Sequence, residues 1–265
     1  MERAEPKARS GAHAGVTMLR AFKCTLHVHT CLSPCGDLDM HPRAIVDQAL
    51  ASGLDIIAIS DHNSSENVPA VLNAAQGTAL TIIPGMEVTT REEVHMLSLF
   101  ENMEKLSVFQ EFIYSRLDGL NDAETFGMQV IANELGEVEG FNDRLLIGAT
   151  RISIEELVNK VHELGGLSIP AHIDRPAFGM LNQLGFMPPQ VPFDALEISA
   201  RLGIIRGRQK YPELSSYTFV TSSDAHFLQD IAQAFITLYL EEPSFSEIRK
   251  ALRKEDGRYV EEGPC

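Results

Sequence analysis

The chain has 265 residues, 44 % of them hydrophobic, so it is long enough to bury a sizeable core within one large α/β domain. No apolar run approaches the roughly 20 residues that a membrane-spanning helix needs. The formal net charge of −15 comes without any run of Lys and Arg, which argues against extended nucleic-acid binding but allows a small anionic substrate held through divalent cations.

The ends and the middle of the chain suggest its domain organisation. Residues 1–18 mix charge, Ala and Gly without periodicity and lack the apolar centre of a secretory signal, so we expect a disordered leader. A single domain is expected over residues 19–265. Without a secretion signal, the four cysteines predict free thiols and a cytoplasmic location. Residues 101–150 depart from the alternation of strand and helix patterns seen in the rest of the chain, with a helix expected near 104–117. We therefore predict that this segment is an insertion over the functional site.

Apolar runs of strand length alternate with helical patterns along the rest of the chain. A helix is predicted over residues 42–51, with Pro42 in its first turn. Residues 54–60 are nearly all apolar, as in a parallel strand that is buried on both faces. Further strands are expected at residues 23–28, 79–83, 94–100, 167–170, 195–199, 218–221 and 234–240.

Two later helices begin with capping boxes. Ser153 is followed by Glu156, and Ser244 by Glu247, which is the spacing that satisfies the first free N–H groups of a helix. We expect these helices to end near residues 164 and 252. The alternation of strands and helices predicts a parallel sheet, closed or open.

Histidines and acids gather at the ends or starts of the predicted strands. In a parallel α/β barrel the C-terminal strand ends meet on one face, so these side chains are expected to converge there. Alternate side chains of a strand share a face, so His27 and His29 point the same way and suit one divalent ion. Imidazole and carboxylate ligands accept Zn, Mn or Fe. The full set is His27, His29, Asp61, His62, Glu87, His95, His172, Asp224 and His226.

Six segments resemble the PHP family, the polymerase and histidinol phosphatase superfamily, and occur in that family's order. They are LHVHT (26–30), GLDIIAISDHN (53–63), PGMEVTT (84–90), VHMLSLF (94–100), IPAHIDRP (169–176) and TSSDAH (221–226). The resemblance implies a distorted seven-stranded β/α barrel, similar to a TIM barrel, that holds two or three divalent metal ions. The close spacing of Glu87 and His95 resembles the stand-alone phosphoesterase branch.

The resemblance also implies how the ligands divide among the ions. The first ion would be surrounded by four residues: His27, His29, Glu87 and Asp224. Glu87 would bridge to a second ion, which His95 and His172 also bind. A third ion would take His62, His226 and one acid from the loop after the first histidine pair.

That acid departs from the family's usual Ser-Asp-Gly, because the chain reads Ser-Pro-Cys-Gly-Asp over residues 33–37. Counting back from Pro42, which matches a proline that the family often has, favours Asp37. Three alternatives stay open: Cys35, Asp39 and His41.

Three residues are predicted to serve catalysis. Glu87 would do so as the bridging ligand. Arg175 lies three residues after His172, where similar enzymes place an arginine near the substrate, and its planar fork fits a phosphate; a surface salt bridge is the alternative. Asp61 is expected to orient a ligand histidine rather than to transfer protons. Two further arginines, Arg201 and Arg206, are weaker candidates for phosphate binding.

The predicted function is hydrolysis of a small phosphorylated metabolite, nucleotide or oligonucleotide end by a metal-activated water. An amidohydrolase-like C–N hydrolase is one alternative, although such enzymes commonly use a bridging lysine and none follows a candidate strand here. A non-catalytic metal-binding sensor is the other, but a degenerate site would have lost several ligands. Neither a membrane partner nor extended nucleic-acid binding is expected.

Overall fold

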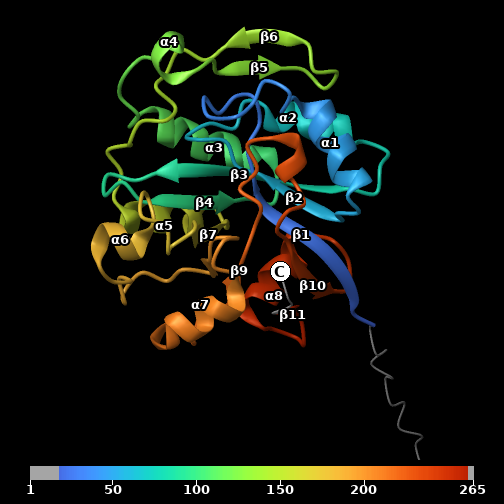
Figure 1. The fold of residues 1–265 in the computed structure, drawn as a ribbon, viewed down its shortest axis with the longest axis vertical. Coiled ribbons are helices and arrows are strands. Elements are labelled where there is room, and N and C mark those ends of the chain that lie inside the picture. Colours follow the sequence, from blue (N-terminus) through green and yellow to red (C-terminus); the bar gives the residue numbers. More distant parts are fainter. Residues whose placement is uncertain (1–17, 262–265) are drawn as a thin grey trace, which may run out of the picture.

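The computed structural model describes residues 18–261 (Figure 1). The predicted leader therefore lies outside the described residues, except for Met18, which is exposed. The strands are β1 (Arg20–Val28), β2 (Ile56–Ile59), β3 (Thr81–Thr89), β4 (His95–Leu99), β5 (Val130–Ala132), β6 (Val138–Phe141), β7 (Leu167–Pro170), β8 (Leu196–Glu197), β9 (Phe219–Val220), β10 (Ile236–Leu240) and β11 (Tyr259–Glu261).

The helices lie mostly between these strands. The α-helices are α1 (Pro42–Ala51), α2 (Val68–Ala75), α3 (Met103–Tyr114), α4 (Ala123–Phe126), α5 (Ile154–Glu163), α6 (Met180–Leu184), α7 (Ile204–Lys210) and α8 (Phe245–Arg253), and the 3₁₀ turns are Pro212–Leu214 and Leu228–Asp230. The predicted helix over residues 42–51 is confirmed to the residue. The capping box of Ser153 and Glu156 is also confirmed.

Seven strands form one curled sheet in the order β11-β10-β1-β2-β3-β4-β7. The strand pairs β1–β2 and β2–β3 are parallel, whereas β3–β4, β4–β7, β1–β10 and β10–β11 are antiparallel. The expectation of a parallel sheet is therefore correct only for its centre. The sheet is a half-barrel and not the closed seven-stranded barrel that the resemblance implied, because β8 and β9 pair with each other as a separate two-stranded sheet.

The burial of apolar side chains stabilises the centre of this sheet. All four residues of β2 are fully buried, as expected for a parallel strand covered on both faces. Helices α2, α5 and α8 pack beside β3, β7 and β10, respectively. One large core cluster runs from β1 to β11 and joins the strands to these helices, so the strand ends are held on a rigid base.

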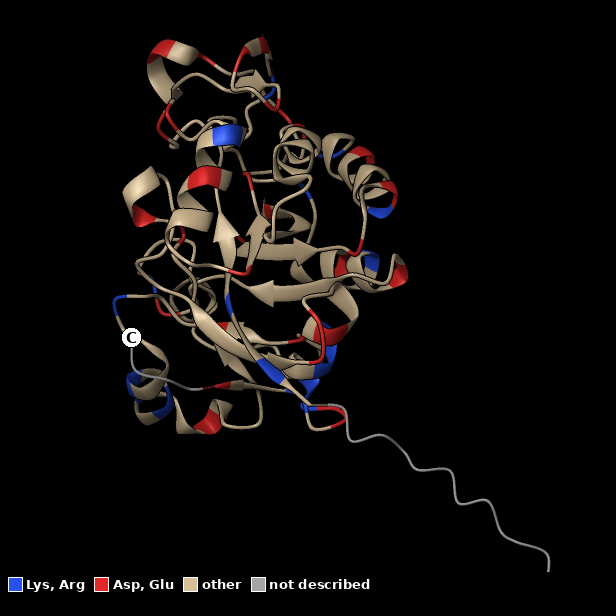
Figure 2. Ribbon diagram, turned by 90° about the vertical axis from the view of Figure 1, so that its right-hand side faces the viewer, with Lys and Arg blue, Asp and Glu red and all other residues tan. Residues whose placement is uncertain are grey.

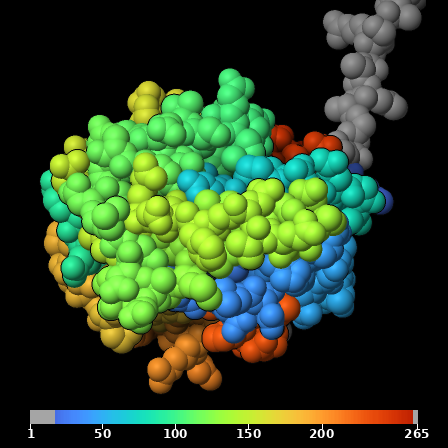
Figure 3. All heavy atoms as spheres, turned by 90° about the horizontal axis from the view of Figure 1, so that it is seen from above, coloured from blue at the N-terminus to red at the C-terminus, as the bar shows by residue number. Residues whose placement is uncertain are grey.

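The segment 101–150 contains α3, α4 and the hairpin of β5 and β6, and it covers much of the face seen in Figure 3. The hairpin is tied to the loop after β1, since Val130 donates its N–H to Cys31 O at 3.0 Å. Asn67 fastens the same hairpin through both ends of its side-chain amide. The segment thus packs directly on the loop that follows the first histidine pair.

The charged residues and the helix lengths bear on possible partners. Acidic positions are spread over the outer loops and helices of the molecule, including the end formed by the segment 101–150 (Figure 2). Among residues 18–261, none of the helices has the length and apolarity to cross a membrane.

We predict that Gly85, two residues before Glu87 on β3, accepts no larger side chain. A Cβ there would lie 2.7 Å from Leu99 Cδ2 and 2.9 Å from the backbone oxygen of Ile59. Gly85→Ala should therefore lower the free energy of unfolding by about 1–3 kcal/mol, measured by urea denaturation. Gly140→Ala is the matched control in β6: its Cβ would meet no described atom within 4 Å, so it should cost nothing. Equal stability of the two variants would contradict the prediction.

Candidate metal centre

Five imidazole side chains from four parts of the chain converge on one carboxylate. Glu87 lies near the end of β3 and is 1 % exposed. Five imidazole nitrogens lie 3.0–3.4 Å from its two oxygens: His95 Nδ1 at 3.0 Å, His62 Nδ1 at 3.1 Å, His27 Nε2 and His172 Nε2 at 3.3 Å, and His29 Nε2 at 3.4 Å. The histidines that the sequence predicted at separate strand ends are therefore brought together.

The strand directions explain why these residues meet. Because β4 runs antiparallel to β3, its first residue, His95, pairs with Thr89 at the end of β3. Because β7 runs antiparallel to β4, its last residue, Pro170, pairs with Met96, and His172 follows two residues later. A histidine at a strand start and another after a strand end thus reach the same edge of the sheet.

The segment after β9 brings the last two ligand candidates to this edge. Ala225 forms a bridge with Val28 of β1 and accepts the N–H of His29 at 3.0 Å. Asp224 Oδ1 then lies 3.2 Å from His29 Nε2, and the rings of His29 and His226 are 4.2 Å apart. Both residues join the cluster through this backbone pairing.

A carboxylate that the sequence analysis missed holds the far side of the cluster. Glu197 ends β8, is 2 % exposed, and its Oε2 accepts from His27 Nδ1 at 3.1 Å and from the backbone N–H of His172 at 3.0 Å. An ionised carboxylate only accepts, so Nδ1 of His27 carries a proton and Nε2 is the ring atom that faces the cluster. The available signal was an acid in the middle of an otherwise mostly apolar strand predicted at 195–199.

Asp61 acts on the neighbouring loop and not on the adjacent His62. Its carboxylate accepts the backbone N–H of Thr30 at 2.7 Å and the hydroxyl of Ser33 at 2.7 Å. Ser33 Oγ in turn lies 2.9 Å from His29 Nδ1. Asp61 therefore fixes the orientation of the His29 ring through Ser33, which makes it a positioning residue.

Burial and charge give this cluster the protonation states that a cation needs. Burial lowers the pKa of His29 to about 4 and that of His62 well below its usual value, so both rings are neutral near pH 7. Although burial raises the pKa of Glu87, the surrounding His95, His27 and His62 hold it well below its usual value. Burial likewise opposes ionisation of Asp224, yet His27 lowers its pKa. Neutral imidazoles and ionised carboxylates are the ligand forms of divalent metals.

Backbone strain concentrates at the same place. His172 and Asp224 have φ angles of 28° and 49°, in the left-handed region that residues with a Cβ rarely adopt. Each sits where its segment turns at the cluster. Such strain persists only where the surrounding structure over-determines it, and it is enriched at ligand-binding sites.

The donor set fits divalent metal ions. The cluster contains three groups whose ligand atoms all lie within 4.8 Å of one another: His29, His62 and His226; His27, His29 and Asp224; and His62, Glu87 and His95. Four buried polar atoms of the cluster have no hydrogen-bond partner among the described residues: His62 Nδ1, His172 Nδ1, Glu87 Oε1 and Glu197 Oε1. Ligand atoms held about 2.0–2.1 Å from a tetrahedral ion lie about 3.3 Å apart, close to the 3.0–3.4 Å spacing around Glu87.

A cavity of about 200 Å³ opens onto the cluster, lined also by Cys35, Arg175 and Phe178. Arg175 is 45 % exposed and lies 2.5 Å from Asp224 Oδ2, so the predicted arginine is at the site and is paired with a ligand candidate. Asp37, in contrast, does not line the cavity. Its carboxylate accepts the N–H of Asp39, and Cys35 occupies the cavity wall.

Family models match most of the described chain. The model described as the PHP domain matches residues 25–166, and the model described as PHP-associated matches residues 209–256. Among curated proteins, the uncharacterized protein YqxK of Bacillus subtilis (strain 168) is 22 % identical in an alignment of 244 residues that covers 82 % of this chain and 56 % of YqxK.

Solved structures share the fold. The endonuclease Q of Pyrococcus furiosus, a lesion-specific endonuclease, is 19 % identical with a TM-score of 0.73, over 91 % of this chain and 58 % of that one. A protein from Bifidobacterium adolescentis described as a metal-dependent phosphoesterase is 18 % identical with a TM-score of 0.56, over 88 % and 96 %. The chain thus spans a little over half the length of YqxK and of endonuclease Q.

One comparison overturns the expectation of no extended nucleic-acid binding. Endonuclease Q has also been solved with a 27-mer duplex that carries an abasic lesion at the active site, and that structure matches 91 % of this chain with a TM-score of 0.69 and 18 % identity. The argument from net charge was wrong because binding depends on the local field at a cleft and not on the sum over the chain.

We predict that Glu197→Gln weakens metal binding by about 10–100-fold without unfolding the protein. The amide keeps the shape of the side chain but removes the negative charge that fixes His27 Nδ1–H. Competition between the metal-free protein and a chromogenic chelator would measure the affinity. Glu163→Gln, in an exposed pair with Lys160 on α5, is the control and should bind metal like the unaltered protein. Unchanged affinity in Glu197→Gln would rule out the positioning role.

Proposed function

The chain belongs to the PHP domain family, and we propose that it is a metal-dependent phosphoesterase that hydrolyses phosphodiester bonds of a nucleic-acid strand. The observation that carries the proposal is the convergence of five imidazoles and Asp224 around the buried carboxylate of Glu87. The likeness to endonuclease Q, whose solved complex contains duplex DNA, supports a nucleic-acid substrate.

The ligand set suits two or three divalent ions of Zn, Mn or Fe. We assign His27, His29, Glu87 and Asp224 to one ion, and Glu87, His95 and His172 to a second. His62 and His226 remain for a third, together with Asp37 as the sequence predicts. Bound ions would lower the pKa of a water molecule and neutralise phosphoryl oxygens.

The chain's own residues supply the rest of the chemistry. The cavity of about 200 Å³ admits a phosphate group but lies below the size of pockets that enclose a whole ligand, so the remainder of the substrate extends outside it. Arg175 has five N–H donors, and its pair with Asp224 leaves others free to hold phosphoryl oxygens. Asp61 and Glu197 keep the ligand histidines oriented while the charge on the phosphate changes.

We predict that Glu87→Gln lowers the rate of phosphodiester hydrolysis about a thousandfold or more, because five imidazoles of the centre lie within 3.4 Å of the Glu87 oxygens. The purified protein would be assayed on a labelled oligonucleotide, a phosphomonoester and an amide panel, with Zn²⁺ or Mn²⁺ added and with EDTA. Elemental analysis would count the bound ions in parallel.

The control for that variant is Glu101→Gln, an exposed carboxylate paired with Lys105 beyond the opposite end of β4. It should keep the full rate. Bound metal with no hydrolysis of any ester would contradict the proposal, and cleavage confined to amides would replace it with a C–N hydrolase.

A further inference from the structure

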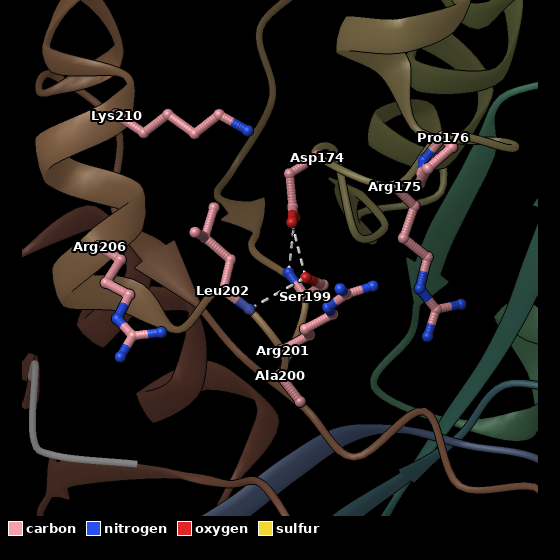
Figure 4. A pocket seen from close by; sticks show the side chains of 9 residues that line it. All are labelled: Asp174, Arg175, Pro176, Ser199, Ala200, Arg201, Leu202, Arg206 and Lys210. Atoms are coloured by element: carbon pink, nitrogen blue, oxygen red, sulfur yellow. Dashed lines mark hydrogen bonds between the residues drawn. The ribbon is translucent and has the colours of Figure 1, made fainter.

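A larger and more basic cleft adjoins the metal-centre cavity. It has a volume of about 760 Å³ and shares Arg175 with that cavity. Its other lining residues come from the segment after β7, the loop after β8 and α7, and its charged members are Asp174, Arg175, Arg201, Arg206 and Lys210 (Figure 4). Four of these five side chains are cationic, in a chain whose net charge is −15.

The one carboxylate of this cleft is already hydrogen-bonded within the protein. Asp174 accepts the backbone N–H of Ser199 at 2.7 Å and the Ser199 hydroxyl at 2.6 Å, and Figure 4 shows its side chain pointing at Ser199. Both carboxylate oxygens are therefore engaged with the loop after β8. Arg175 is already paired with Asp224, so the uncompensated positive charge of the cleft lies mainly on Arg201 and Arg206.

Two of the arginines form no ion pair that would stabilise the fold. Arg201 and Arg206 are exposed and form no ion pair with any residue between 18 and 261. Arg208, on the same helix, contrasts with them: its guanidinium lies 4.1 Å from the ring centroid of Phe219 and donates to Tyr217 O at 3.0 Å. Arginines that only stabilised α7 would be expected to make contacts like those of Arg208.

The arrangement of the charges fits an extended anion. Arg206 and Lys210 are four residues apart on α7 and so share a helix face, and Figure 4 shows them on one side of the cleft with Arg175 on the other. Arg201 stands in the loop between them. Because Arg175 also borders the metal centre, a strand with one phosphate in the cavity can place its next phosphates along this row.

We propose that this cleft binds the sugar-phosphate backbone of the nucleic-acid strand next to the bond that is cleaved, with Arg201 and Arg206 contacting successive phosphates. The inference rests on the proposed function, whose substrate class it specifies. Contacts of this kind carry no base specificity, so the cleft would position the strand rather than select a sequence. The acidic surface elsewhere would confine the strand to this row.

The test is binding of a fluorescein-labelled single-stranded oligonucleotide with phosphorothioate linkages, which resist hydrolysis, to the metal-loaded protein. Fluorescence anisotropy at several salt concentrations gives both the affinity and its salt dependence. In R201A/R206A we expect about tenfold weaker binding, and the slope of log K against log salt should shrink by about 1.4, since each lost phosphate contact removes about 0.7 for a single strand.

The control variant is K105A/K160A, which removes the same charge at the opposite end of the sheet, on α3 and α5. It should bind with the affinity and slope of the unaltered protein. Thermal melting and metal content of R201A/R206A should equal those of the unaltered protein, because neither arginine supports the fold. Identical affinity and slope in both double variants would overturn the proposal.

The outcome separates this inference from the proposed function. Absence of ester hydrolysis by the unaltered protein would remove the phosphoesterase activity, while the anisotropy would still report on the cleft. Conversely, if the protein hydrolyses oligonucleotides but R201A/R206A binds them as tightly as the unaltered protein, the proposed activity stands and the binding role of the cleft is rejected. A loss in K105A/K160A equal to that in R201A/R206A would show only a general charge effect and would also reject the cleft.

Discussion

The structure depends on keeping several imidazoles and two carboxylates together in a place that water barely reaches. Burying ionisable groups costs free energy unless opposite charges or hydrogen bonds compensate it. Here Glu87 and Asp224 hold the pKa of His27 well above its usual value against the effect of burial, while His29 and His62 are kept neutral. The favourable charge interactions of the cluster therefore oppose the cost of burial, and a bound cation would supply the partner that Glu87 Oε1 and His62 Nδ1 lack.

That requirement explains the unusual mixture of strand directions. A wholly parallel sheet would supply side chains only from strand ends, whereas the antiparallel β4 adds His95 from a strand start. The buried hydrogen bonds of Asp61 and Glu197 then fix the rings of His29 and His27 from the side away from the cluster. Glu197 resides on the small sheet of β8 and β9, so this sheet serves the site although it lies outside the main one.

Much of this was predictable because periodicity and burial are local properties of the sequence. The helix over 42–51 and the strand over 167–170 match the structure to the residue. The directions of β4 and β7 were not predictable, since a short strand that is buried along its whole length has the same pattern in either direction. At Ser244 half of the expected capping box is absent, because the carboxylate of Glu247 accepts from Glu241 N–H and from Arg258.

The candidate site shows the same division between local pattern and tertiary context. Ligand candidates at strand ends were identifiable by residue type and position, and their side chains lie together in the structure. Asp37 lies in a loop, where no periodicity constrains the direction of a side chain, and its place in a third metal site stays a prediction. The three arginines were candidates for phosphate binding, but the cleft itself could not be predicted, because Arg175 follows β7 whereas Arg201 and Arg206 follow β8 and only the fold brings them together. Net charge is a sum, but a polyanion responds to the field where it lands, so an acidic chain can present one basic path to a metal centre.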